Sequence, residues 1–212
     1  MTYLTAWTLV KSQQNAEFRQ LLASLDVCYA DGMGVVLALL FTKFRRIRKV
    51  TANSFYPSLF EEISHRGLKV ALVGGQKGVS QTVASRIEAL APSIDICLCR
   101  TGYLSDDEEQ HLVDELTQAN PHIVFLSMGQ PLQEQCAHRW RQALPHTVFY
   151  CVGGLFDLIA GRATFAPAWI RQIGLEWLWR LVHSPKQLWR RYLTGLPLLA
   201  IYILHNLAPT QA

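Results

Sequence analysis

Four short apolar runs that end in glycine turns constrain the fold of this 212-residue chain more than any other feature. The runs are 69–73, 94–99, 122–127 and 147–152, and stretches with helical spacing separate them. Strands that alternate with helices across short glycine turns are typical of a parallel sheet covered on both faces. Ligands of open α/β sheets bind at the carboxyl ends of the strands. We therefore predict an α/β, Rossmann-like fold whose loops converge on one site.

Two segments near the N-terminus fit the same pattern. Residues 3–7 have the composition of a short strand, and we expect a helix to follow it to about residue 25. Residues 27–30 read as a buried strand that ends at Asp31-Gly32, which would place the carboxylate of Asp31 at the carboxyl end of that strand. Asp31 is then either a ligand-facing carboxylate or the N-cap of a helix over residues 35–41.

A glycine turn and a cluster of bases are the candidate phosphate contacts. The turn over residues 74–78, Gly-Gly-Gln-Lys-Gly, exposes backbone N–H groups and a helix start, although its spacing fits neither the P-loop nor the dinucleotide fingerprint. Five basic residues lie between Lys43 and Lys49 and could hold a diphosphate. A plain tight turn and a solvated loop are equally open interpretations of the two segments.

The last third of the chain differs in composition from the rest. From Arg162 onward there are six basic residues and one acidic residue. Helical spacing divides this region into three segments: an apolar stripe over 170–181, a short basic amphipathic helix from Ser184-Pro185, and an apolar run over 198–207. The last run is too short to cross a bilayer, which requires about 20 residues. Four of the six tryptophans lie in this region: Trp169, Trp177, Trp179 and Trp189.

Basic helices edged with tryptophan suit the interface of an anionic membrane, where the rings sit among headgroups and Lys and Arg meet lipid phosphates. The same stripes could instead dock on the core of the protein or on a second subunit. A homo-oligomer is therefore an alternative to membrane binding.

Composition narrows the remaining classes. With 50% hydrophobic residues, the chain can bury a full-size core. Its first residues lack the basic stretch and cleavage site of a signal peptide, so we expect a cytoplasmic protein. The five cysteines are scattered, with no histidine at ligand spacing, and are best interpreted as small buried side chains. We expect no metal, no cofactor and no nucleic-acid partner.

Short motifs distributed over nearly the whole chain form an ordered set. They are Ala30-Asp31-Gly32-Met33-Gly34, Val73-Gly74-Gly75, Gly102-Tyr103, Gly129-Gln130-Pro131-Leu132-Gln133-Glu134, Val152-Gly153-Gly154-Leu155-Phe156-Asp157, Ala166-Pro167-Ala168-Trp169, Gly174-Leu175-Glu176-Trp177 and Pro185 through Leu193. Taken together, they resemble the WecG/TagA/CpsF family of bacterial glycosyltransferases. Members of that family move a sugar, typically N-acetylmannosamine or its uronate, from a UDP donor to an undecaprenyl-diphosphate-linked sugar.

The resemblance implies a core over residues 1–162, shorter at its N-terminus than in the family, and a helical C-terminal appendage over 163–212 that brings the enzyme to the inner face of the membrane. It also implies an inverting transfer of a hexose or N-acetylhexosamine from a UDP-sugar to a polyprenyl-diphosphate-linked acceptor. Such a transfer needs a base for the acceptor hydroxyl and positive charge for the leaving diphosphate, which arginines can supply without a metal.

The same comparison gives individual residues expected roles. Asp31 resembles the catalytic carboxylate, and Thr5 resembles an active-site threonine. The expected substrate-binding residues are Gln133, Gly74, Gly75, Gly102, Tyr103, Gly129, Gly153, Arg48, Arg180 and Arg191. The residues expected at the membrane are Trp179, Trp189 and Arg190.

The chain also departs from the family pattern. Trp7 stands where the family tends to have asparagine, Phe165 replaces the arginine of an Arg-Ala-Pro motif, and Gln187 replaces an arginine after Pro185. These departures and the shorter N-terminus leave two other functions open. One is a non-catalytic relative that binds a UDP-sugar or a partner transferase. The other is a soluble nucleotide-binding domain whose tail is a dimerisation arm.

Overall fold

The computed structural model describes residues 1–32, 35–36, 52–164, 166–167, 169–170, 175–189 and 193–207. The chain divides into two compact units. The first contains Met1–Thr2, Ser24–Val27 and Ala52–Ala163, and the second contains Tyr3–Ala23, Cys28–Thr51 and Thr164–Ala212. These units group N-terminal with C-terminal segments, and the division at residue 162 that the family resemblance implies stays a prediction.

The first unit is built on a parallel sheet with the strand order β4-β3-β5-β6. Its strands are β3 (Lys69–Gly74), β4 (Asp95–Arg100), β5 (Ile123–Ser127) and β6 (Val148–Cys151). The backbone of Met1 pairs with β6: its nitrogen donates to the oxygen of Phe149 at 2.6 Å, and its oxygen accepts from the nitrogen of Cys151 at 3.0 Å. All four apolar runs are thus confirmed as strands, within one residue or so at their ends.

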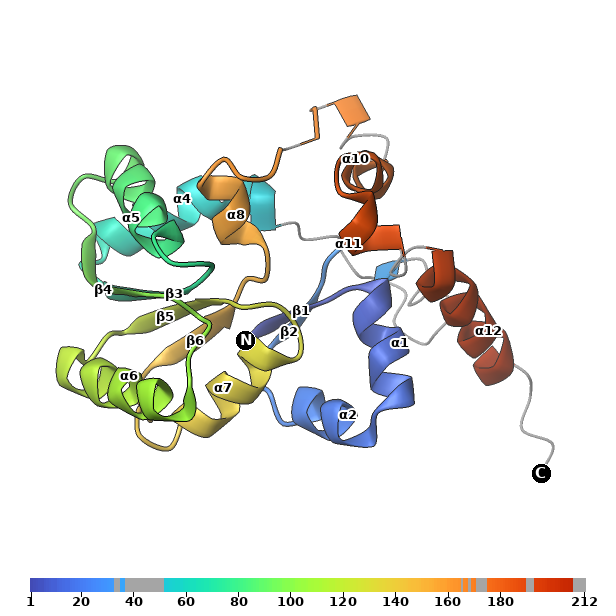
Figure 1. Ribbon diagram of the computed structural model, residues 1–212, viewed down its shortest axis with the longest axis horizontal. Coiled ribbons are helices and arrows are strands. Elements are labelled where there is room, and N and C mark those ends of the chain that lie inside the picture. Colours follow the sequence, from blue (N-terminus) through green and yellow to red (C-terminus); the bar gives the residue numbers. More distant parts are fainter. Residues whose placement is uncertain are drawn as a thin grey trace. The chain divides into compact units, whose positions relative to one another are not determined.

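Helices cover both faces of this sheet, as Figure 1 shows. On one face lie α4 (Ala52–His65), α5 (Val79–Leu90) and α8 (Leu155–Ile159), and on the other lie α6 (Asp106–Ala119) and α7 (Leu132–Trp140). The predicted α/β fold with a parallel sheet flanked by helices is confirmed. Helix α4 begins at Ala52 and contains Pro57 as its sixth residue. A proline at this position removes a backbone hydrogen bond and crowds the carbonyl four residues earlier, and α4 accommodates that cost.

The strands are apolar throughout because both faces of the sheet are buried. Towards α6 and α7, Ala71 and Val73 pack in a cluster that includes Trp140. On the opposite face, the ring of Phe125 lies 5.1 Å from that of Phe60 and 5.4 Å from that of Tyr150, measured between centroids. Each fully buried large apolar side chain contributes about 1.5–3 kcal/mol, so the core of this unit is substantial.

A capping box formed by Ser105 and Glu108 starts α6. The Oγ of Ser105 accepts from the backbone nitrogen of Glu108, and the Glu108 carboxylate accepts from the backbone nitrogen of Ser105 at 2.8 Å. The helix ends at Asn120, which adopts the left-handed conformation with φ +48°. These local signals place α6 between β4 and β5, where the alternation of strands and helices requires it.

In the second unit, polar caps shorten the predicted N-terminal elements. The elements are β1 (Thr2–Leu4), α1 (Ala6–Gln14), α2 (Ala16–Ala23) and β2 (Cys28–Ala30). The strand predicted over residues 3–7 ends at Leu4, because the Oγ1 of Thr5 accepts from the nitrogen of Thr8 at 3.1 Å and starts α1. The single helix predicted to residue 25 is two helices, because the Oδ1 of Asn15 accepts from the nitrogen of Phe18 at 2.9 Å and starts α2.

Within the described residues, the C-terminal part of the second unit contains the helices α10 (Glu176–His183), α11 (Pro185–Trp189) and α12 (Gly195–Leu207). One side of α12 packs on α1, where Val10 and Leu199 are buried among the side chains around them. The contact is close, since a Cβ on Gly195 would lie 2.9 Å from a ring carbon of Trp7. Within the described residues, no helix is long and apolar enough to span a bilayer.

Candidate active site

The carboxyl ends of β3 and β5 approach each other so closely that only glycine fits between them. Gly74 ends β3 with φ +148°, and a Cβ there would lie 2.6 Å from the carbonyl carbon of Ser127 and 2.7 Å from its nitrogen. The next nitrogen, that of Gly75, donates to the carbonyl oxygen of Ser127 at 2.9 Å. Gly74 is therefore required by the packing of the two strands, independently of any ligand.

The turn after β4 is tied to the same point. The oxygen of Gly75 accepts from the nitrogen of Gly102 at 3.3 Å and from the Oγ1 of Thr101 at 3.0 Å. Gly102 lies against Gly74 and the side chain of Met128, so a side chain at Gly102 would displace them. The turns after β3, β4 and β5 thus form one hydrogen-bonded cluster.

The turn after β6 joins this cluster through buried side chains. The Oγ of Ser127 donates to the oxygen of Gly153, and the nitrogen of Gly153 donates to the Oε1 of Gln133 at 3.0 Å. The nitrogen of Gln133 in turn donates to the oxygen of Gly129 at 3.1 Å. The structure therefore brings together the carboxyl-end turns of all four strands, as the pattern of glycine turns predicts.

A cavity of about 280 Å³ opens beside this cluster. Tyr103 stands at it with 63% of its surface exposed, which makes its phenol ring accessible to a flat ligand. The cavity is lined by Gly102, Tyr103, Leu104, Glu109, Met128, Leu132, Cys136 and Trp140.

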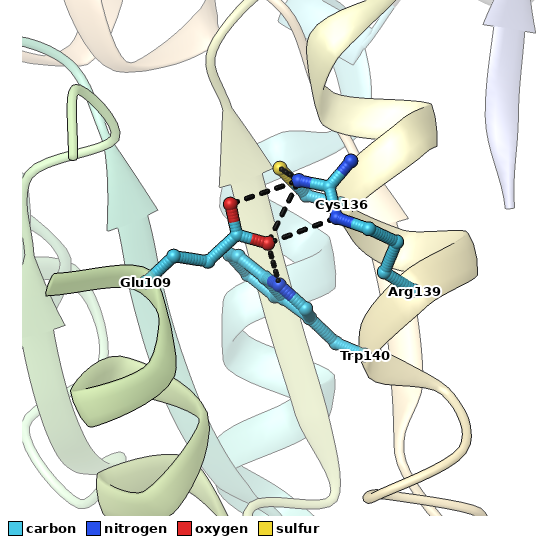
Figure 2. A network of polar contacts seen from close by, with 4 residues as sticks. All are labelled: Glu109, Cys136, Arg139 and Trp140. Carbon is cyan, nitrogen blue, oxygen red and sulfur yellow. Dashed lines mark hydrogen bonds and ion pairs between the residues drawn. The ribbon is translucent and has the colours of Figure 1, made fainter. Parts of the chain in front are cut away.

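Figure 2 shows the polar group in the wall of this cavity, where Glu109 of α6 meets α7. Its carboxylate accepts from the Nη2 of Arg139 at 2.7 Å and from the Nε1 of Trp140 at 2.8 Å. Burial alone would raise the pKa of Glu109, but the hydrogen bonds from Trp140 and Arg139 outweigh it, and the pKa is lowered. Glu109 is therefore an ionised anchor between two helices at neutral pH.

The thiol in the same wall is not poised for nucleophilic chemistry. Burial raises the pKa of Cys136 to about 11, although the neighbouring Arg139 acts in the opposite direction. Only thiolates are strong nucleophiles, so this cysteine is a packing residue. None of the five cysteines forms a disulfide. The expectation that they are buried was wrong for Cys28, which is exposed.

Thr5 and Asp31 belong to the second unit and lie at neighbouring strand ends. Asp31 directly follows β2, and its nitrogen donates to the oxygen of Leu4, the residue before Thr5, at 2.8 Å. Thr5 is 7% exposed, and its hydroxyl lies 2.9 Å from the Oγ1 of Thr8 as part of the cap of α1. The two residues expected to be catalytic thus share one strand pair, and one of them already has a structural task.

The chain matches a family model, the Glycosyl transferase WecG/TagA/CpsF family, over residues 1–212. The chain belongs to this family.

Two curated relatives share one name, N-acetylglucosaminyldiphosphoundecaprenol N-acetyl-beta-D-mannosaminyltransferase. The one from Bacillus subtilis (strain 168) is 29% identical over 191 residues, which is 90% of this chain and 73% of the relative. The one from Bacillus spizizenii (strain ATCC 23059 / NRRL B-14472 / W23) is 29% identical over 184 residues, which is 87% of this chain and 70% of the relative.

The residues expected to be functional in a glycosyltransferase of this family distribute over the molecule as follows. The first unit joins Gln133 and the glycines 74, 75, 102, 129 and 153 into one cluster, with Tyr103 beside it. Gln133 is 0% exposed there, so its side chain holds a turn, and its contact with substrate stays a prediction. The second unit holds Thr5 and Asp31.

The expected cationic contacts lie largely outside the described residues. Arg48, Arg190 and Arg191 fall there, and so does the side chain of Arg180. Of the tryptophans expected at the membrane, Trp189 is 44% exposed. The ring of Trp179 is half-buried and stacks on His183 with centroids 4.0 Å apart.

The sequence patterns gave no role to several polar residues that hold the turns together, above all the buried Ser127 and Glu134 and the half-buried Thr101. A signal was present for one of them, because Gln133-Glu134 is a polar pair directly after a strand and turn. Among the residues that the structure describes, no group of three His, Cys, Asp or Glu side chains could hold a metal ion. Independence of metal stays a prediction.

Proposed function

We propose that this member of the glycosyltransferase family transfers an N-acetylmannosamine-like hexosamine from a UDP-sugar to an undecaprenyl-diphosphate-linked N-acetylglucosamine, with inversion at the anomeric carbon. Family membership supports the reaction class. The shared name of the two Bacillus relatives supports the transferred sugar and the lipid-linked acceptor. The observation that carries the proposal is the cluster of glycine turns at the carboxyl ends of all four strands of the first unit.

The UDP-sugar is proposed to bind at this cluster. The backbone N–H groups at the start of α5 suit a diphosphate, because the first turn of a helix presents partial positive charge. Gly78, at the start of α5, adopts φ +86° and leaves the cap of the helix without a side-chain hydrogen bond. The accessible ring of Tyr103 beside the cavity is suited to stack on a nucleobase.

Asp31 is proposed as the general base. A base must remove the proton of the acceptor hydroxyl as the oxygen attacks the anomeric carbon, and a carboxylate within hydrogen-bond reach can do so. The leaving UDP accumulates negative charge on its diphosphate, which Arg48, Arg180 and Arg191 are proposed to stabilise. Thr5 is proposed to contact substrate while it caps α1.

Release of UDP in the presence of the donor and a short-chain lipid-linked N-acetylglucosamine tests this proposal. We expect Asp31→Asn to lower turnover at least about 100-fold, the usual contribution of general base catalysis. Asp26→Asn, at an exposed position shortly before β2, is the matched control and should turn over like the wild type. Unchanged turnover in Asp31→Asn would remove Asp31 from the mechanism, and no UDP release by the wild type would refute the reaction.

The C-terminal segment is proposed to dock peripherally on the inner face of the cell membrane. Exposed apolar side chains support this, since Trp169 is 63%, Val182 is 68% and Leu193 is 65% exposed. They lie in the region with six basic residues and one acidic residue, the composition that favours an anionic lipid surface.

Flotation with vesicles that contain anionic lipid tests the docking. Each cation near such a surface contributes about 1 kcal/mol, so Arg190→Glu/Arg191→Glu should weaken vesicle binding by more than about tenfold at low salt. Arg141→Glu, an exposed charge reversal in the first unit, is the matched control and should float like the wild type. Binding that ignores both the double reversal and the salt concentration would contradict the proposal.

A further inference from the structure

A buried carboxylate lies at one end of the hydrogen-bond network beneath the glycine turns. Glu134 is in the first turn of α7 and is 0% exposed. Its Oε1 accepts from the Oγ1 of Thr2 at 2.6 Å, from the Nε2 of Gln133 at 2.8 Å and from the Nε2 of Gln130 at 3.1 Å. Its Oε2 is buried and has no hydrogen-bond partner within the described residues. Every bond to this carboxylate therefore falls on one oxygen.

This oxygen determines which way round the amide of Gln133 is held. The Nε2 of Gln133 donates to Glu134, and its Oε1 accepts from the nitrogen of Gly153 at 3.0 Å. A half-turn flip of the amide would set its NH₂ against the N–H of Gly153 and its oxygen against the carboxylate. Two unsatisfied pairs between fully buried groups are costly, so the acceptor on Glu134 enforces a single orientation.

Gly153 carries that orientation into the candidate active site. It adopts the left-handed conformation with φ +59°, and its oxygen accepts from the Oγ of Ser127. The carbonyl oxygen of Ser127 accepts from the nitrogen of Gly75. The buried amide of Gln133 is therefore hydrogen-bonded directly to the turn after β6 and is connected through Ser127 to the turn after β3.

Burial of the Glu134 carboxylate is energetically unfavourable, which indicates that this residue does more than connect Thr2 to α7. Burying a charge is unfavourable unless it is well paired, and within the described residues the hydrogen bonds to Glu134 come from a hydroxyl and two amides. The N-terminus of α7 offsets part of this cost. A carboxylate presents only acceptors, whereas a hydroxyl or amide could rotate and present a donor to Gln133.

We propose that Glu134 is a positioning residue for the donor site: it fixes the amide of Gln133, and through it the Gly153 turn, in the geometry that binds a UDP-sugar. The identity of the ligand rests on the proposed function, whereas the fixed turn is a property of the first unit alone. Glu134 acts through Gln133 and is not proposed to touch the substrate.

The test combines hydrogen exchange of the Gly153 amide with UDP binding by calorimetry, in the full chain. Glu134→Met keeps the length of the side chain and removes the acceptor, so we expect Gly153 to exchange at least about tenfold faster and UDP to bind about tenfold more weakly. Glu134→Gln keeps one oxygen that the three donors can reach but can also turn its NH₂ towards Gln133, so both quantities should lie between those of the wild type and those of Glu134→Met.

Thr2→Val is the matched control, because it removes one hydrogen bond to the same oxygen but leaves Gln133 its acceptor. It should lower the melting temperature and leave the exchange of Gly153 and the affinity for UDP unchanged. A merely structural role predicts instead that Thr2→Val and Glu134→Met change stability and UDP affinity in parallel, and that result would overturn the proposal.

Two further outcomes keep the test decisive. If Glu134→Met does not fold, Gln133→Met should accelerate exchange of Gly153 to the same extent, and unchanged exchange in that variant would overturn the proposal. If the wild type binds no UDP, the proposed function fails, while the exchange of Gly153 in the variants still decides whether Glu134 sets the turn.

Discussion

Replacement of Gly74 by alanine probes the closest approach in the candidate active site. The new Cβ would lie 2.6 Å from the carbonyl carbon of Ser127, which belongs to the backbone of β5 and cannot rotate away. The ends of β3 and β5 must therefore separate. The hydrogen bond of 2.9 Å from Gly75 to Ser127, which joins the two turns, would be strained or lost with that movement.

The expected cost follows from two contributions. A side chain at φ +148° adds about 1–3 kcal/mol of backbone strain, and the lost hydrogen bond adds about 1 kcal/mol. Together these give about 3 kcal/mol. At roughly 2–4 °C per kcal/mol for a chain of this size, the melting temperature should fall by about 6–12 °C.

Gly67→Ala supplies the control for backbone conformation. Gly67 also has a positive φ, +61°, but a Cβ there would meet no described atom within 4 Å. Only the cost of the left-handed conformation remains, about 1 kcal/mol. Thermal and urea unfolding of both variants measure the difference, which should be about 2 kcal/mol. Equal destabilisation by the two substitutions would show that the approach of β3 to β5 does not require glycine.

Two other predictions concern titratable groups. Glu109→Gln should lower the melting temperature at pH 7 by the equivalent of about 1 kcal/mol, because it breaks the charged pair with Arg139. The folded-state pKa of Glu109 is lowered, so this stabilisation is present at pH values above the unfolded-state pKa and is lost as the pH falls through the folded-state pKa. Thermal melts across pH should therefore show the melting temperatures of the two proteins converging in acid. A difference in melting temperature that widens in acid would contradict the lowered pKa. Iodoacetamide at about pH 8 should modify Cys28 first, because Cys28 is exposed while burial raises the pKa of Cys99 and Cys136 to about 11. Mass spectrometry of Cys28→Ser should show that the fast reaction is gone, and equally fast labelling of Cys136 would refute the burial of its thiol.

The sequence predicted the elements whose signals are local. The buried strands appear as continuous apolar runs in the sequence because both faces of a parallel sheet are covered. The start of α6 is indicated by Ser105 and Glu108, which are three positions apart as a capping box requires. The strand over residues 3–7 was overestimated because Thr5 suits an extended strand as well as a helix cap. Propensity alone does not choose between these two uses.

The candidate site was predictable only in outline. Glycine turns pointed to the carboxyl edge of the sheet, but the side chains that lock the turns come from distant parts of the chain. Thr2 and Glu134, which are 132 positions apart, share a hydrogen bond that no spacing rule anticipates. The resemblance to the family identified Gln133 as a substrate contact, whereas its burial shows a task within the protein that a motif alone does not reveal.

Because α12 packs on α1, the stability of the second unit depends on contacts between the N-terminal and C-terminal segments of the chain. Val10 of α1 is 0% exposed and Leu199 of α12 is 6% exposed, because both belong to the apolar cluster that the two helices form together. Deletion of α12 would therefore expose the apolar side of α1, whose N-cap is Thr5. Loss of activity in such a truncated protein would then result from a damaged fold and would not show that a membrane anchor is missing. Polar replacement at Ile201, which is 58% exposed on α12, separates the two effects cleanly.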